Sequence, residues 1–301
     1  MSKSFRCLEL LLMLAMAASA GCGATEDPSP SITPGGGGGD GGGVVADDGF
    51  SGGAPPNASA ASFPGGKIID LTHAFDEQTI YWPTAEGFKL TVDSAGVTDQ
   101  GFYYAANSFS AAEHGGTHID APIHFFANRK TVDAVPLERL IGPAVLIDVS
   151  AKCEADPDYQ IGVDDLYQWE QRHDRQLVDV IVLLRTGYDR LWPDAEAYLG
   201  TREKGPAAVA KLHFPGLAPE AAKWLVEQRQ VRAVGIDTAS IDYGQSERFE
   251  SHVTLFSSNV PAFENVANLE GLPAVGFSVI ALPMKIAGGS GGPLRIVAVV
   301  P

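Results

Sequence analysis

Eight short runs rich in apolar residues follow one another in the last three quarters of the chain. Several are continuous stretches of β-branched and aliphatic residues, a pattern typical of strands buried on both faces. The predicted strands are KIIDLT (67–72), FKLTVD (88–93), FYYAANSFS (102–110), AVLIDVS (144–150), VDVIVLLRT (178–186), VRAVGIDT (231–238), AVGFSVIALP (274–283) and LRIVAVV (294–300).

Helical patterns separate some of these strands. GVDDLYQWEQRHD (162–174) follows one predicted strand, and APEAAKWLVEQRQ (218–230) runs directly into another. No Gly-rich phosphate-binding turn follows the first strand, which disfavours an open doubly wound fold. The pattern therefore predicts one mixed α/β domain at 67–301, with a large sheet or barrel-like core and flanking helices.

The first residues of the chain have the layout of a secretory signal. Lys3 and Arg6 precede an apolar run at 10–18 and a set of small residues. The run is too short to span a membrane, which takes about 20 apolar residues. It ends in SAGC, which resembles a bacterial lipobox, and cleavage after residue 21 would leave Cys22 as a lipidated N-terminus. Plain secretion, with Cys22 an ordinary residue, is the alternative.

Residues 22–66 are rich in Gly, Pro and Ser and carry few large apolar side chains, so they form a predicted flexible linker. We therefore expect an exported lipoprotein on a bacterial membrane, periplasmic or at the cell surface, which touches the membrane only through its anchor. If Cys22 is acylated, Cys153 has no partner, and the domain must be stable without a disulfide. The net charge of −16 argues against nucleic acid as a partner.

The most informative stretch is EHGGTHIDAPIH (113–124), which holds three of the seven histidines. His118 and Asp120 are two residues apart, so an extended segment points both side chains to the same face. Two glycines precede His118 and disfavour a helix, so a turn folds His114 back toward this face. Pro122 ends regular pairing and leaves His124 on a turn. Imidazoles and a carboxylate that converge in this way are ligands suited to Zn²⁺ or Mn²⁺.

The same stretch carries a family resemblance. HGGTHIDAPIHF (114–125) resembles, position for position, the H-x-G-T-H-x-D-x-P-x-H-F signature of the metal-dependent cyclase family, which includes bacterial kynurenine formamidases and isatin hydrolases. DLTHAF (70–75), GIDTASID (235–242) and SHVTLFSSNVPAFENVANLEGLP (251–273) are similar to further segments of that family. The resemblance implies the family's cyclase-like fold of the swivelling β/β/α type.

The resemblance also implies roles for seven residues. Five bind one or two divalent cations, Zn²⁺ before Mn²⁺, one transfers a proton, and one packs against the substrate. The implied ligands are His114, His118, Asp120, His252 and Glu264, with Asp120 and Glu264 bridging; the proton donor and acceptor is His124, and the substrate contact is Trp82.

The function that the resemblance favours is hydrolysis of an aryl formamide, with N-formylkynurenine as type substrate. Hydroxide generated by the metal would attack the carbonyl, and His124 would pass a proton to the departing amine. Hydrolysis of a cyclic amide or lactone such as isatin is the alternative enzyme function, and a metal- or ligand-binding lipoprotein without catalysis is the non-enzyme alternative. The chain reads WPTA (82–85) where kynurenine formamidases of this family commonly read WPGD. We also expect a homodimer or homotetramer.

Further polar and aromatic residues are weaker candidates. We expect His73 to cap or pack near the site, His213 to pack or face the substrate, and His173 to be solvated. Of Tyr103 and Tyr104, which alternate along a predicted strand, one should face the core and the other could face the pocket.

A serine, two acidic residues and one segment complete the set of candidates. Ser240 and Asp242 lie in the turn TASID (238–242) and could shape the pocket, but turn chemistry explains them without a function. Glu113 either supports the first ligand or is solvated. The segment 190–213 is rich in loop-forming residues and could form a lid over the pocket.

Overall fold

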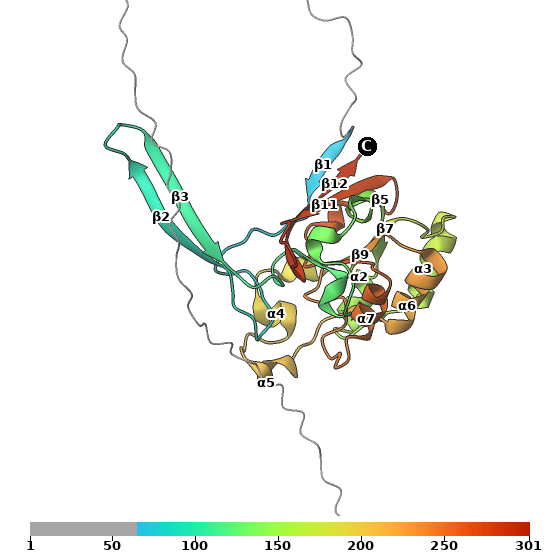
Figure 1. The fold of residues 1–301 in the computed structure, drawn as a ribbon. Helices are drawn as coiled ribbons and strands as arrows, with labels where there is room; N and C mark the ends of the chain where they lie inside the picture. Colours follow the sequence, from blue (N-terminus) through green and yellow to red (C-terminus); the bar gives the residue numbers. More distant parts are fainter. Residues whose placement is uncertain (1–64) are drawn as a thin grey trace, which may run out of the picture. The chain divides into compact units, whose positions relative to one another are not determined.

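The computed structural model describes residues 65–301 (Figure 1). The predicted signal, Cys22 and nearly all of the predicted linker lie outside the described residues. Within 65–301, no helix is long and apolar enough to cross a membrane.

A closed mixed sheet forms the centre of the domain. The strand order is β1-β12-β11-β5-β7-β9-β10-β4, and β4 also pairs with β12, so seven strands close into a ring with β1 attached to its edge. The strands are β1 (Lys67–Asp70), β4 (His118–Asp120), β5 (Ile141–Asp148), β7 (Ile181–Arg185), β9 (Ala233–Ile236), β10 (Ala262–Glu264), β11 (Phe277–Pro283) and β12 (Gly291–Val300). The four strands from β5 to β10 run parallel and the other pairs are antiparallel. The predicted mixed α/β fold with a barrel-like core is confirmed.

The continuous apolar runs reflect burial on both faces of the strands. In β7, Ile181 and Leu183 belong to a cluster to which all seven strands of the ring contribute, so they face the barrel interior. Their neighbours Val182 and Leu184 belong to a second cluster that includes Trp169 and residues from several helices. Successive residues of β7 are therefore buried alternately in the barrel interior and under the helices. Neither face of the strand meets solvent, so its sequence is apolar throughout.

Helices cover one side of this barrel (Figure 1). The longest is α3 (Val163–His173), and α6 (Pro219–Trp224) continues into a π-helical turn at Leu225–Arg229. The remaining helices are α1 (Leu137–Leu140), α2 (Ser150–Ala155), α4 (Ala195–Leu199), α5 (Pro206–Val209) and α7 (Glu250–Ser257), and a small parallel pair joins β6 (Gln160–Ile161) to β8 (Gly216–Leu217).

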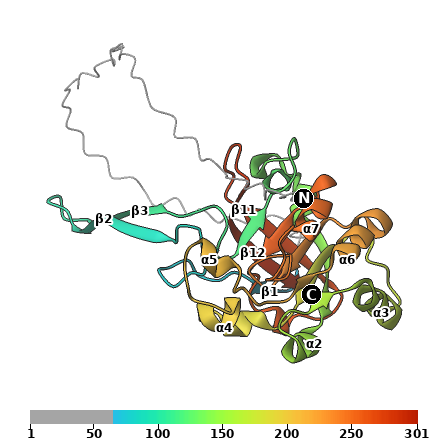
Figure 2. The ribbon, with the colours of Figure 1, turned by 90° about the horizontal axis from the view of Figure 1, so that it is seen from below.

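A long β-hairpin stands apart from the barrel. Strands β2 (Lys89–Val97) and β3 (Tyr103–Ser110) pair with each other and extend away from the rest of the domain in both views (Figures 1 and 2). The expectation that Tyr103 or Tyr104 faces the core or the pocket is therefore wrong. Both side chains lie in solvent, 66% and 51% exposed.

Candidate metal centre

The register of the sheet places the first ligand-type residues side by side. Both His118 and Asp120 lie on β4, are buried, and approach each other to 3.1 Å (Nε2 to Oδ1). Glu264, on the neighbouring strand β10, is directly opposite His118, so the two side chains share one face of the sheet. His118 Nε2 lies 3.5 Å from Glu264 Oε2.

A glycine turn brings His114 to the same place. Gly116 has φ +57°, a left-handed conformation, and a Cβ there would lie 2.6 Å from the ring of Phe75. A Cβ at Gly115 would lie 2.1 Å from the ring of Tyr81. Only glycine fits at both positions, and the turn that results sets His114 Nδ1 at 2.7 Å from Asp120 Oδ1.

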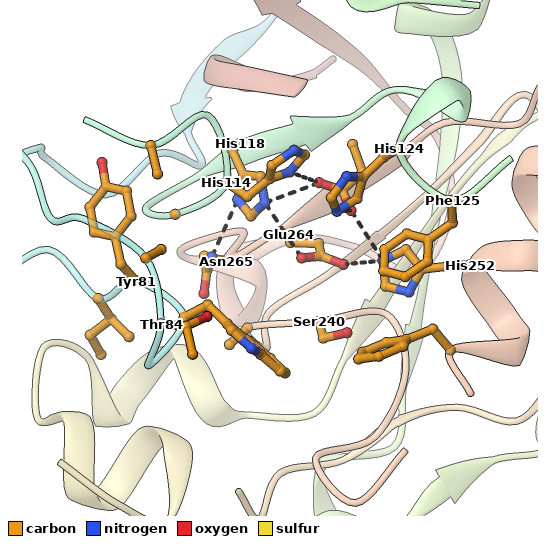
Figure 3. A pocket seen from close by; sticks show the side chains of 18 residues that line it. Tyr81, Thr84, His114, His118, His124, Phe125, Ser240, His252, Glu264 and Asn265 are labelled. Carbon is orange, nitrogen blue, oxygen red and sulfur yellow. Dashed lines mark hydrogen bonds and ion pairs between the residues drawn. The ribbon is translucent and has the colours of Figure 1, made fainter. Parts of the chain in front are cut away.

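Five side chains form two overlapping groups that could hold a metal ion (Figure 3). In each group the ligand atoms lie within 4.8 Å of one another. The first group is His114, His118 and Asp120, and the second is Asp120, His252 and Glu264. Asp120 belongs to both, since its Oδ1 faces His114 and His118 while its Oδ2 lies 3.1 Å from His252 Nε2. The structure thus brings together all five predicted ligands, from segments up to 150 residues apart.

The charges of this centre suit a bound cation. Burial raises the pKa of Glu264, and the neighbouring Asp120 carboxylate raises it further. Burial also acts to raise the pKa of Asp120, but its interactions with the surrounding imidazoles in their protonated forms outweigh burial and hold that pKa well below its usual range. Two carboxylates buried side by side are stable only with a compensating positive charge. A divalent cation with nitrogen and oxygen ligands supplies that charge.

Outer hydrogen bonds fix which nitrogen of each histidine is free. The carbonyl of Gly116 can only accept, so His118 Nδ1 at 2.9 Å carries the proton. Asp242 accepts in the same way from His252 Nδ1 at 2.6 Å. In the neutral form of each ring, Nε2 is therefore the unprotonated nitrogen, and it is directed at the carboxylates, as a ligand requires.

A relay of two residues orients His114. Ser290 donates its hydroxyl hydrogen to Glu113 at 2.6 Å, so its oxygen accepts from His114 Nε2 at 2.8 Å and leaves Nδ1 free. Glu113 therefore supports the first ligand rather than being solvated. Turn chemistry does not fully explain Asp242, because this residue orients His252, and Ser240 from the same turn lines the pocket. Asp242 also accepts from the backbone N–H groups of Ser251 and His252, so it fixes the start of α7 as well as the ring.

His124 lies beside the ligand groups but in neither of them. It ends a 3₁₀ turn that begins at Pro122, and its ring stacks on that of His114 with centroids 3.7 Å apart. Its Nε2 is 3.9 Å from Asp120 Oδ2, which is too long for a hydrogen bond. Burial lowers the pKa of His124 to about 4, so the imidazole is neutral at neutral pH and can accept a proton.

A pocket of about 290 Å³ opens onto these residues (Figure 3). Most of its wall is apolar or aromatic, and Trp82 is part of this wall. The ring of Trp82 packs edge-to-face against Phe214 at 6.4 Å and against Phe249 at 6.3 Å. The apolar and aromatic lining residues are Ile80, Tyr81, Trp82, Ala85, Ala112, Phe125, Ala239 and Phe249.

The pocket wall also contains Asn265, which the sequence reasoning missed. Its Nδ2 donates to the carbonyl of Gly116 at 2.7 Å, and its Oδ1 accepts from Tyr198 at 2.8 Å. Asn265 therefore holds the glycine turn in place from the strand end that carries Glu264. Its position next to Glu264 was the only signal available.

The other histidines do not line this pocket. His73 stacks on Trp192 with centroids 4.2 Å apart, and His213 is exposed and forms a hydrogen bond with Asp158 at 2.8 Å. His173 packs against Trp169 at 4.6 Å rather than being fully solvated. The segment 190–213 contributes Tyr198, among others, to an apolar cluster behind Trp82, and none of its residues lines the pocket.

Comparisons with known proteins agree with this site. The Cyclase family model matches residues 69–243. An isatin hydrolase from Roseibium aggregatum is 33% identical over 79% of this chain and 88% of its own length. A kynurenine formamidase from Bacillus cytotoxicus is 28% identical over 76% of this chain and 95% of its own.

Solved structures show the same relationship. Isatin hydrolase A from Ralstonia solanacearum superposes with a TM-score of 0.71 at 34% identity, covering 79% of this chain and 94% of that one. A protein from Bacillus stearothermophilus described as a predicted metal-dependent hydrolase superposes with a TM-score of 0.56 at 26% identity. The match covers 77% of this chain and 97% of that one. With a matching family model, fold and metal-ligand groups, the chain belongs to the Cyclase family of metal-dependent hydrolases.

Proposed function

We propose that this hydrolase opens the amide bond of a small, neutral, aromatic substrate, with a cyclic aryl amide such as isatin as type substrate. The observation that carries the proposal is the distribution of charge in the pocket. Among residues 65–301, every titratable acidic, basic or imidazole side chain that lines the pocket is one of the five ligand-type residues or His124. The rest of the wall offers aromatic rings, small residues and neutral polar groups.

This wall suits isatin better than N-formylkynurenine, the first expectation from the sequence. N-formylkynurenine carries an α-ammonium and an α-carboxylate, and burying either without a partner is costly. Ala85 lines the pocket at the position where kynurenine formamidases of this family commonly carry Asp. The wall therefore lacks an anionic partner for the ammonium, whereas isatin is flat and uncharged. The 33% and 34% identities to isatin hydrolases support the same choice.

The residues of the site divide the chemistry between them. A divalent cation held by the five ligand-type residues would polarise the substrate carbonyl and lower the pKa of water. His124, neutral and beside this centre, accepts the proton of the attacking water and delivers it to the amide nitrogen as the C–N bond breaks. For isatin, this addition of water opens the ring to a single product that carries a carboxylate and a free aromatic amine, and one proton is released. The rings of Trp82, Phe125 and Phe249 hold the flat substrate and exclude bulk water.

Turnover of matched substrates by the metal-loaded chain tests the proposal. We expect kcat/KM for isatin to exceed that for N-formylkynurenine by about 100-fold, the effect of roughly 2.7 kcal/mol of unpaired polar burial. Simple aryl formamides and lactones complete the panel. A preference for N-formylkynurenine would contradict the proposed substrate. Equal rates for the wild type and His124→Ala on every substrate would favour a binding protein without catalysis.

We propose further that this hydrolase is exported from the cytoplasm and is attached to a membrane by a lipid anchor at Cys22. The sequence of the leader, with SAGC at its end, supports this location. Expressed with its own leader, the wild type should partition into detergent, and Cys22→Ala should remain in the aqueous phase. Equal partitioning of the two proteins would replace the anchor with plain secretion.

A further inference from the structure

Ser240 is a buried residue in the wall of the pocket. It lies in the segment that follows β9, and Figure 3 shows it on the side of the pocket opposite His114 and His124, with Glu264 between them. The backbone N–H of the next residue, Ile241, donates to Glu264 Oε1 at 2.7 Å. The Ser240 side chain therefore faces the pocket beside a carboxylate of the second ligand group.

The hydroxyl of Ser240 has a hydrogen to spare. The backbone N–H of Asp242 can only donate, and it donates to Ser240 Oγ at 3.2 Å. The hydroxyl oxygen is therefore the acceptor in this contact, and its own hydrogen is not used there. Among residues 65–301, no group accepts a hydrogen bond from this hydroxyl. Because the side chain lines the pocket, the hydrogen can point to an acceptor on a bound molecule.

The other neutral polar groups of the wall are less suited to this role. Asn265 uses its amide to hold the glycine turn and to accept from Tyr198. Thr84 is exposed to solvent, so water can satisfy its hydroxyl whether or not a ligand is bound. The hydroxyl of Tyr81 points away from the ligand groups (Figure 3). Ser240 therefore offers the pocket a buried hydrogen-bond donor next to the ligand groups.

We infer that Ser240 donates a hydrogen bond to a substrate oxygen on the carbon next to the scissile carbonyl. This inference rests on the proposed amide hydrolysis and narrows its substrate class to amides with a second carbonyl beside the first. Isatin is such a compound, since its two carbonyl groups occupy adjacent atoms of one planar ring. The scissile carbonyl has to lie between the ligand groups and His124. Its neighbouring oxygen then finds Ser240 on the side of Glu264 away from His124.

A donor of this kind selects substrates through the cost of leaving it unpaired. A ligand with a methylene in place of the second carbonyl removes water from the Ser240 hydroxyl and offers no acceptor in return, which weakens binding. Sites built to hydrogen-bond a substrate group reject analogues without that group more strongly than apolar pockets reject a change of size. Ser240 is therefore a specificity-determining residue of the pocket.

Two ligands that cannot be hydrolysed measure this preference without turnover. One is 2-aminophenylglyoxylate, the ring-opened product of isatin, which keeps the second carbonyl. The other is 2-aminophenylacetate, in which a methylene replaces that carbonyl. Calorimetric titration of the metal-loaded full-length chain gives a dissociation constant for each. We expect Ser240→Ala to weaken binding of the first ligand by about 10-fold or more and to change binding of the second by less than about 2-fold.

Ser246→Ala is the matched control, because it removes a hydroxyl from the same loop. Ser246 Oγ donates to Asp242 Oδ1 at 3.3 Å and accepts from the backbone N–H of Phe249 at 3.1 Å. Of the described residues that line the pocket, Ser246 is not one. Weaker support for Asp242 affects both ligands alike, so the ratio of the two dissociation constants should stay at the wild-type value in Ser246→Ala.

Steady-state kinetics with isatin give an independent readout. The hydrogen bond is made to an oxygen that does not react, so Ser240→Ala should raise KM by about 10-fold and change kcat by less than about 3-fold. A loss confined to kcat, equal weakening of both ligands, or a wild type that binds neither ligand overturns the inference. A wild type that does not turn over isatin, but whose preference between the two ligands depends on Ser240, rejects the proposed reaction and supports the hydrogen bond.

Discussion

The metal centre and the β2–β3 hairpin depart from the ordinary burial pattern in opposite directions. The centre buries two carboxylates, Asp120 and Glu264, together with the imidazoles of His118 and His252. The hairpin instead exposes large apolar side chains. Soluble proteins usually bury apolar groups and keep charged groups in water. The first departure indicates that a cation belongs at the centre, and the second leaves apolar surface that no other part of residues 65–301 covers.

The two regions differ in how firmly the chain itself holds them. The candidate ligands sit on strands of a closed ring and are oriented by outer partners such as Asp242 and Ser290. The hairpin is held by one strand pairing and by the aromatic contacts at its base. The chain thus preorganises the metal centre itself, whereas the hairpin has little support from the rest of residues 65–301. Substitutions at the centre should therefore change metal binding and chemistry and leave the hairpin unchanged.

The largest effect is expected for Asp120→Ala. This residue alone belongs to both ligand groups, so its loss should abolish binding of one or both ions and lower kcat/KM by about 1,000-fold or more. Elemental analysis should find one or two divalent ions in the wild type, Zn²⁺ before Mn²⁺, and a content near zero in the variant. Glu270→Ala, which removes an exposed carboxylate, is the control. Full metal content in Asp120→Ala would show that the shared-ligand assignment is wrong.

His124→Ala should separate proton transfer from metal binding. The ring lies next to both ligand groups but outside them, so metal content should remain at the wild-type level. Loss of a general acid–base group typically lowers kcat by 100- to 10,000-fold. A parallel loss of metal and activity would make His124 a ligand instead.

Asp242→Asn tests the orientation of His252 from outside the ligand groups. Loss of a hydrogen-bonded carboxylate behind a metal-binding histidine typically weakens metal affinity by 10- to 100-fold. Competition with a chelator measures this change. Asp158→Asn is a matched control, because it alters the equivalent contact to His213 on the exposed surface. Equal metal affinities for the two variants would refute an orienting role.

Ala85→Asp should change the substrate preference rather than the metal site. A carboxylate in the pocket wall gives the ammonium of N-formylkynurenine a partner, so kcat/KM for this substrate relative to isatin should rise by about 10-fold. Steady-state kinetics on both substrates measure the ratio, and Ala85→Asn is the neutral control. An equal shift in the two variants would point to shape rather than charge.

The sequence predicted local features of the site well because they depend on neighbouring residues. The spacing of His118 and Asp120 and the glycines before them predicted the shared face and the turn, and both are present. His252 and Glu264 required the family resemblance, since only the folded sheet brings them to β4. The contact of Asp242 with His252 was missed because a turn residue and an outer partner look alike in sequence.

The hairpin shows a second limit. Its alternating pattern predicts strands with one apolar face, and β2 and β3 are indeed strands. The same pattern arises whether that face packs on the protein's own core or on another molecule. Periodicity therefore predicts that the hairpin has an apolar face but not what covers that face. This is why Tyr103 was wrongly expected near the core or the pocket.

The smallest effect concerns His73, a partly buried imidazole that is in neither region. Burial lowers the pKa of His73 to about 4, whereas an unfolded chain titrates near 6.5. Between these values the unfolded state binds more protons, so the free energy of unfolding falls as the pH drops from 6.5 toward 4.

Phenylalanine can keep the stacking on Trp192 without titrating. The wild type should therefore lose about 1 to 2 kcal/mol more than His73→Phe between pH 7 and pH 4.5, an additional drop in Tm of a few degrees. Thermal unfolding across this range measures the difference, with His213→Phe on the exposed surface as the control. Identical pH dependence in the wild type and His73→Phe would show that this ring does not contribute to the acid sensitivity of the fold.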